Sequence, residues 1–94
     1  MKVYIGMYIV KPDNQETITQ VNKTIEQLFA TNGSKMLEFE EQGVRGLAYE
    51  IQNFTQGYYV KFVVEATLEA VKEYNRICNI NENIIRHILV LKDE

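Results

Sequence analysis

The chain has 94 residues, of which 46% are hydrophobic and 24% charged, and its net charge is −3. A chain of this size builds one hydrophobic core, so we expect a single domain over residues 1–94. The acidic balance argues against binding nucleic acid by bulk electrostatics, which needs clustered Lys and Arg, although local basic patches stay possible. The one cysteine, Cys78, cannot form an internal disulfide and favours a reducing cytoplasm.

Residues 2–10 (KVYIGMYIV) are nearly all apolar and rich in β-branched and aromatic side chains, which predicts a strand. Lys11 and Pro12 end the apolar run well short of the length of a signal peptide or a membrane span, so we expect neither. Both faces of this strand are apolar, so it should be central in its sheet and covered on both sides.

An amphipathic helix is predicted over residues 14–31, where apolar side chains recur at spacings of three and four. Asp13 or Asn14 can cap its start, and Gly33 supplies the left-handed residue that ends it. The apolar positions of this helix are Ile18, Val21, Ile25, Leu28 and Phe29.

Two strands that form a hairpin are predicted next. Apolar and polar side chains alternate along residues 35–52, which predicts a strand with one face toward the core and one toward water. Gly43 and Gly46 interrupt the pattern and suggest a bulge or bend. Residues 53–57 should form the turn, and residues 58–66 the third strand. The inward parity of the first of these strands is Leu37, Phe39, Leu47, Tyr49 and Ile51, and the outward parity includes Glu38 and Glu40.

Thr67 can cap a second helix, whose expected inner face is Leu68, Val71, Tyr74 and Cys78. Residues 79–83 (NINEN) indicate a loop, and residues 84–91 (IIRHILVL) a last strand. The order β-α-β-β-α-β predicts an α+β, ferredoxin-like (split βαβ) fold, in which two helices cover one face of a four-stranded antiparallel sheet. This architecture serves many functions, so function has to be argued from residues.

The residues offer little for catalysis or metal binding. One His and one Cys without spaced partners do not predict a metal site, and nothing in the sequence calls for a cofactor. A nucleophile built from Cys78 and His87 would lack a group to orient the base, so Cys78 fits the core better. Glu38 and Glu40 could suggest acid–base chemistry, but alternation places them on a solvated face.

Two functions known on this fold, one enzymatic and one in RNA binding, do not fit the residues. An acylphosphatase would carry an Arg in a glycine-containing loop after the first strand, and neither residue type stands there. Tyr58 lies in a stretch (QGYYVKF) comparable to the strand on which RNA-recognition modules stack bases, but the leading residue is Gln56, and Tyr58 should face the core.

One feature does indicate a partner. Successive side chains of a strand point to opposite faces of its sheet. If Tyr4 and Tyr8 face the helices, the opposite face carries Ile5, Met7 and Ile9, so that face should be apolar in places. Exposed apolar surface usually marks an interaction site. A second copy of the chain or long side chains could cover it instead.

The segment GVRGLAYEI (residues 43–51) resembles the G-x-R-x-L-A-Y-x-I signature of the bacterial small-subunit ribosomal protein S six family. The resemblance continues through GYY (57–59) and IIRHI (84–88), begins at MYIV (7–10), and spans essentially the whole chain. It implies a ferredoxin-like fold, no enzymatic activity, and a cytoplasmic, ribosomal location. It further implies binding to the central domain of small-subunit ribosomal RNA, as a heterodimer with ribosomal protein S eighteen, without DNA or membrane.

Four residues are carried over from the resemblance as RNA-binding or partner-binding residues: Lys2, Arg45, Tyr49 and Arg86. The chain lacks basic residues that many family members carry at the positions of Gly46 and Val44, and it has Ile5 where Glu is common. We therefore expect weak RNA affinity for the protein alone, a shallow salt dependence, and strong dependence on the protein partner. A stand-alone, dimeric ferredoxin-like binding module without RNA is the alternative.

Overall fold

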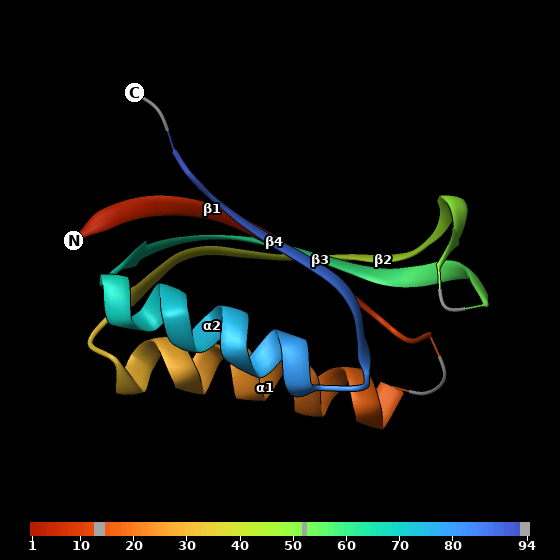
Figure 1. The fold of residues 1–94 in the computed structure, drawn as a ribbon, viewed down its shortest axis with the longest axis horizontal. Coiled ribbons are helices and arrows are strands. Elements are labelled where there is room, and N and C mark those ends of the chain that lie inside the picture. Colours follow the sequence, from red (N-terminus) through yellow and green to blue (C-terminus); the bar gives the residue numbers. More distant parts are fainter. Residues whose placement is uncertain (13–14, 52, 93–94) are drawn as a thin grey trace.

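A computed structural model describes residues 1–12, 15–51 and 53–92. The elements are β1 (Lys2–Val10), α1 (Gln15–Thr31), β2 (Lys35–Ile51), β3 (Phe54–Ala66), α2 (Leu68–Ile80) and β4 (Ile84–Leu91). Within these ranges the strands form one antiparallel sheet in the order β2-β3-β1-β4, with both helices on one face (Figure 1). The ferredoxin-like prediction is confirmed, including the central position of β1. The expectation that β1 is covered on both sides is wrong within the described ranges, where both helices lie on one face.

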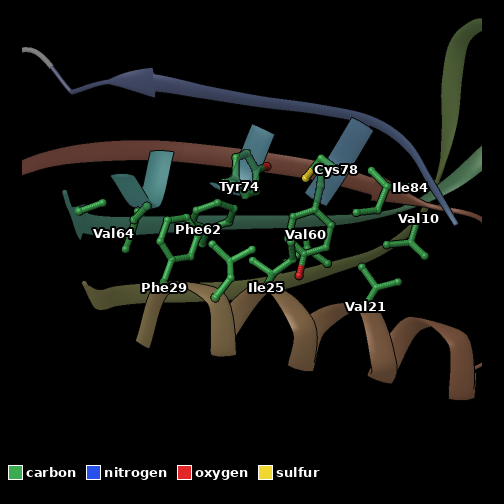
Figure 2. Close-up of a cluster of buried hydrophobic side chains, with 14 of the residues drawn as sticks. Val10, Val21, Ile25, Phe29, Val60, Phe62, Val64, Tyr74, Cys78 and Ile84 are labelled. Carbon is green, nitrogen blue, oxygen red and sulfur yellow. The ribbon is translucent and has the colours of Figure 1, made fainter. Parts of the chain in front are cut away.

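The core lies between the sheet and the two helices (Figure 2). Phe62 of β3 is its hub, with its ring 5.5 to 6.0 Å from the rings of Tyr8, Phe29 and Tyr74. Gly6 lies opposite Phe62 in the sheet, and a Cβ atom at Gly6 would stand 2.2 Å from the Phe62 ring. The core therefore requires a residue without a side chain at this point of β1.

Most of the predicted helix boundaries are confirmed. Gly33 ends α1 with a φ of +70°, and the Thr67 side chain caps α2 by accepting a hydrogen bond of 3.1 Å from the Ala70 amide. The expected caps of α1, Asp13 and Asn14, lie outside the described residues. Neither helix in the described ranges is long and apolar enough to cross a membrane.

Two details of α2 differ from prediction. Leu68 is 63% exposed, because it is the first helical residue and lies two positions before buried Ala70, which places it on the opposite side of the helix. The inner face is formed by Ala70, Tyr74 and Cys78, with Cys78 in the core as predicted. The helix also continues to Ile80, so the loop that follows is shorter than the predicted 79–83.

The simple alternation predicted for β2 is wrong. The register against β3 shifts between Met36 and Glu38 and again between Glu41 and Gly43, and each shift reverses the parity that faces the helices. Met36 and Phe39 both pack against the core as a result, while Leu37 is 46% exposed. The third shift falls beyond Gly46, so both predicted glycine positions lie beside irregularities.

The hairpin between β2 and β3 is tighter than predicted, because β3 already begins at Phe54 and Asn53 adopts a φ of +69°. Gly46 pairs with Gln56 and Ile51 pairs with Phe54, so residues 47–50 of β2 oppose a single residue of β3. We call residues 47–50 the hairpin bulge. Figure 1 shows this end of the hairpin turned away from the helices, toward the open face of the sheet.

Candidate RNA and protein interface

The sheet face opposite the helices, here called the open face, is apolar over β1, as predicted, and also over β4. Ile5 and Met7 are half-buried, and their cross-strand neighbours Val90 and Ile88 are 52% and 44% exposed. Near the hairpin, Ile9 is covered by its neighbours on this face. A hollow of about 150 Å³ at this end is lined by Met7, Ile9, Tyr59, Arg86, His87 and Ile88.

The β2 side of the open face is charged. Glu38 and Glu40 are exposed there, and Glu40 stands directly opposite Lys61 on β3. Together with Ile5, Val63 and Lys92 these side chains border a broad depression of about 610 Å³. The open face therefore changes from charged, with Glu38 and Glu40 near Lys61, to apolar at β1 and β4.

The three arginines of the chain differ in what holds their side chains. On α2, Arg76 forms an ion pair with Glu73, which neutralises its charge. Arg86 and Arg45 are instead held by uncharged oxygens: Arg86 donates to the Tyr49 hydroxyl, and the Arg45 Nε atom lies 3.5 Å from the Gln42 carbonyl oxygen. Among the described residues neither has a carboxylate partner, so both guanidinium groups remain free to bind an anion.

Arg86 and Tyr49 come together across the whole width of the sheet. Tyr49 lies in the hairpin bulge of β2, and Arg86 lies on β4 at the opposite edge. The Tyr49 ring centroid is 6.0 Å from the Arg86 guanidinium carbon, which adds a cation–π contact to the hydrogen bond. Two of the residues carried over from the resemblance therefore form one unit.

A second cation–aromatic contact lies at the same end of the sheet and was not selected from sequence. The Lys11 ammonium nitrogen is 5.8 Å from the Phe54 ring centroid, where β1 ends and β3 begins. The hairpin end therefore carries two cation–aromatic pairs. The spacing of Lys11 and Phe54 along the chain gives no signal for this contact, because only the sheet brings them together.

Lys2 does not join this group. It pairs with Ala66 at the far end of β1, whereas Arg86 pairs with Ile9. Seven residues of strand separate Lys2 from Ile9, which at ~3.3 Å per residue is roughly 23 Å. By strand alternation Lys2 also belongs to the face that the helices cover, in step with Tyr4 and Tyr8. Any role of Lys2 in binding would be at a separate point.

The groups considered for catalysis do not form a site. Burial raises the pKa of the Cys78 thiol to about 12, which keeps the thiol protonated and unreactive. Burial also lowers the pKa of His87, whose ring packs edge-on against Tyr74. In the described part of the chain no three His, Cys, Asp or Glu residues cluster in a way that could hold a metal ion.

Residues 4–91 match the model of the family described as Ribosomal protein S6. The chain belongs to the ribosomal protein S six family. The family is structural and non-enzymatic, so the chain is a structural ribosomal protein of the cytoplasm and not an enzyme.

Individual relatives agree with this family along the full chain. Small ribosomal subunit protein bS6 of Shouchella clausii is 42% identical over 99 aligned positions, covering 100% of this chain and 99% of the relative. The protein of the same name from Phytoplasma australiense is 42% identical over 92 positions, covering 96% and 98%. The crystal structure of 30S ribosomal protein S6 from Thermotoga maritima superposes with a TM-score of 0.91 at 22% identity, over 97% of this chain and 87% of that chain, which supports the fold.

Proposed function

We propose that this chain binds the central domain of small-subunit ribosomal RNA together with ribosomal protein S eighteen, with RNA at the hairpin end and the protein partner on the open face. One observation carries the proposal. Two guanidinium groups, those of Arg45 and Arg86, are held by uncharged oxygens at one end of an apolar sheet face. This arrangement offers an anion site directly beside a surface for a protein.

The RNA part of the proposal rests on charge and ring chemistry at the hairpin end. A guanidinium can bind phosphate oxygens through two parallel hydrogen bonds, and both arginines keep donors free for this. Tyr49 is 60% exposed and Arg86, which it contacts, is also exposed, so a phosphate can reach the guanidinium group of this pair. Glu38 and Glu40 on β2 would repel a phosphate backbone, which favours RNA contact at the hairpin end over contact along β2.

The protein part rests on the apolar residues of β1 and β4. Ile88 and Val90 leave about half of their surface in water, which favours a partner that covers them. A partner that reaches across to β2 would need basic residues opposite Glu38 and Glu40. A segment with an apolar face and a basic margin fits this surface.

Lys2 would supply a separate contact at the far end of β1. The proposal assigns it to backbone contact with RNA or to the partner. Because it lies apart from the other three residues, its contribution should be independent and additive.

The deciding experiment is a titration of a central-domain RNA fragment with the protein, with and without the partner, at two salt concentrations. We expect weak binding by the protein alone and tight binding with the partner. Arg45→Gln and Arg86→Gln should each reduce the salt slope by roughly 0.7 to 0.9, the value for one lost phosphate contact. Lys72→Gln, an exposed charge on α2, is the matched control and should leave the slope unchanged.

RNA binding that is equal with and without the partner would overturn the heterodimer. RNA affinity and salt slope that stay the same in both arginine variants would overturn the assigned RNA site. The Lys2→Gln variant, measured in the same series, decides whether contacts extend along β1.

The alternative is a dimer that buries the open face against a second copy, for which the exposure of Ile88 and Val90 is also an argument. Sedimentation equilibrium separates the two. A monomer over a wide concentration range, which associates only when the partner is added, supports the heterodimer, whereas a dimer lost on Ile88→Lys supports the alternative.

A further inference from the structure

We propose that Tyr49 is a positioning residue, which holds the Arg86 guanidinium in place for phosphate and joins the hairpin bulge to β4. The inference rests on the proposed function and adds to it a division of roles: Arg86 touches RNA, and Tyr49 acts through Arg86.

The placement of Tyr49 depends on the register shift that forms the hairpin bulge. In a regular ladder a β2 residue could not reach β4, because β3 and β1 lie between them. The bulge places residues 47–50 outside the ladder, on a hairpin end that turns toward the open face (Figure 1). Tyr49 can therefore reach over two strands to Arg86.

Apolar packing seats the bulge on the sheet. The Leu47 Cδ2 atom lies 3.7 Å, and the Ile85 Cδ1 atom 3.8 Å, from the point where a Cβ atom of Gly57 would stand. Ile9 fills that point so closely that a Cβ atom there would be 2.2 Å from its Cγ2 atom. The absence of a side chain at Gly57 lets these groups converge, so the position of Tyr49 does not depend on the hydrogen bond to Arg86 alone.

The Tyr49–Arg86 contact fixes the cation without neutralising it. A tyrosine hydroxyl accepts one of the five guanidinium N–H groups and carries no charge, so four donors and the full positive charge remain available. A carboxylate at the same place would neutralise the charge, as Glu73 does for Arg76. Holding a long side chain before binding reduces the entropy lost when phosphate is bound.

The first test is Tyr49→Phe, which keeps the ring over Arg86 and removes the acceptor oxygen. We expect RNA affinity in the presence of the partner to fall about three- to tenfold, the range for one hydrogen bond. The salt slope should not change, because no charge is lost. Tyr4→Phe, at the far end of β1, is the matched control. Thermal unfolding should be unaltered, since Tyr49 is largely exposed.

A double-mutant cycle with Arg86→Gln distinguishes positioning from direct contact. Positioning predicts that Tyr49→Phe has no effect once Arg86 is Gln. An undiminished loss in that background would mean that Tyr49 itself touches RNA and would overturn the inference. Full affinity of Tyr49→Phe in the presence of Arg86 would overturn it as well.

A measurement on the free protein separates this inference from the proposed function. The NMR relaxation of the Arg86 Nε–Hε group should report restricted motion in the wild-type protein and free rotation in Tyr49→Phe. If Arg86 is equally mobile in both, the positioning role is wrong even where RNA binds. If Arg86 is restricted but its replacement leaves RNA binding unchanged, the proposed RNA site fails instead.

Discussion

The Tyr8 hydroxyl donates a hydrogen bond of 2.6 Å to Asn22 Oδ1, joining the central strand β1 to α1 inside the core. The same amide continues outward, because Asn22 Nδ2 donates a bond of 2.6 Å to Glu41 Oε1 on β2. One buried amide thus satisfies a phenol and a carboxylate and ties together three elements. Asn22 is the one buried polar residue found among the described positions.

Replacing Tyr8 by Phe should destabilise the protein by about 1 to 3 kcal/mol, because the buried Asn22 oxygen would lose its hydrogen-bond donor. Urea unfolding of the two proteins measures the difference. Tyr4→Phe, whose hydroxyl is not in this network, serves as the control. Equal midpoints for wild type and Tyr8→Phe would show that the amide adapts without loss.

Gly6→Ala should lower the free energy of unfolding by about 1 to 3 kcal/mol, since the Cβ atom of the alanine would overlap the buried Phe62 ring. Gly46→Ala is the matched change on β2, where nothing lies within 4 Å of the added atom, and it should be close to neutral. Thermal denaturation provides the comparison. Adding Phe62→Leu to Gly6→Ala should restore part of the lost stability, because the smaller side chain makes room for the new methyl group. If the double variant is less stable than Gly6→Ala alone, the steric explanation is wrong.

Alkylation of Cys78 should be slow in the folded protein. Its thiol is buried, and burial raises its pKa to about 12, so at neutral pH the reactive thiolate is scarce and shielded. Labelling with iodoacetamide, followed by mass spectrometry, should accelerate as urea is added toward the unfolding transition. Labelling of the native protein at the rate of a free small thiol would rule out a closed core around Cys78.

His87 should make stability depend on pH near neutrality. Burial lowers its pKa from the ordinary 6.5, so as pH falls the unfolded chain takes up the proton before the folded protein does. The stability associated with neutral His87 is therefore complete above pH 6.5 and is lost as pH falls through that value toward the folded pKa. His87→Gln should remove this slope below about pH 6.5, measured by urea unfolding. Parallel curves for both proteins would contradict the assignment.

The order of elements was predictable because each element is locally consistent. The sequence contains two amphipathic helix patterns and four runs rich in β-formers, and helix ends are marked by Thr67 and Gly33. Few topologies are compatible with this order of elements. In β2, where the predicted alternation failed, register shifts were responsible. Alternation read along residues 35–52 cannot reveal a bulge, because an inserted residue changes the facing parity without changing the residue types.

The candidate site residues could be named from the sequence only as a set, and their part in binding stays a prediction. Arg45, Arg86 and Tyr49 came from the resemblance, and the structure brings Arg86 and Tyr49 into contact. Sequence could not indicate that contact, because it depends on the number of residues that leave the ladder before Ile51. Nor could it indicate the contact between Lys11 and Phe54, which are far apart along the chain.

The register shifts of β2 have a further effect before the protein meets its partners. β2 is an edge strand, and the outer hydrogen-bonding groups of such a strand can pair with the edge of another molecule. Three breaks in register, together with exposed Glu38 and Glu40, make this edge irregular and charged. The same irregularities that break the alternation in the sequence should therefore keep newly synthesised copies from pairing edge to edge and aggregating.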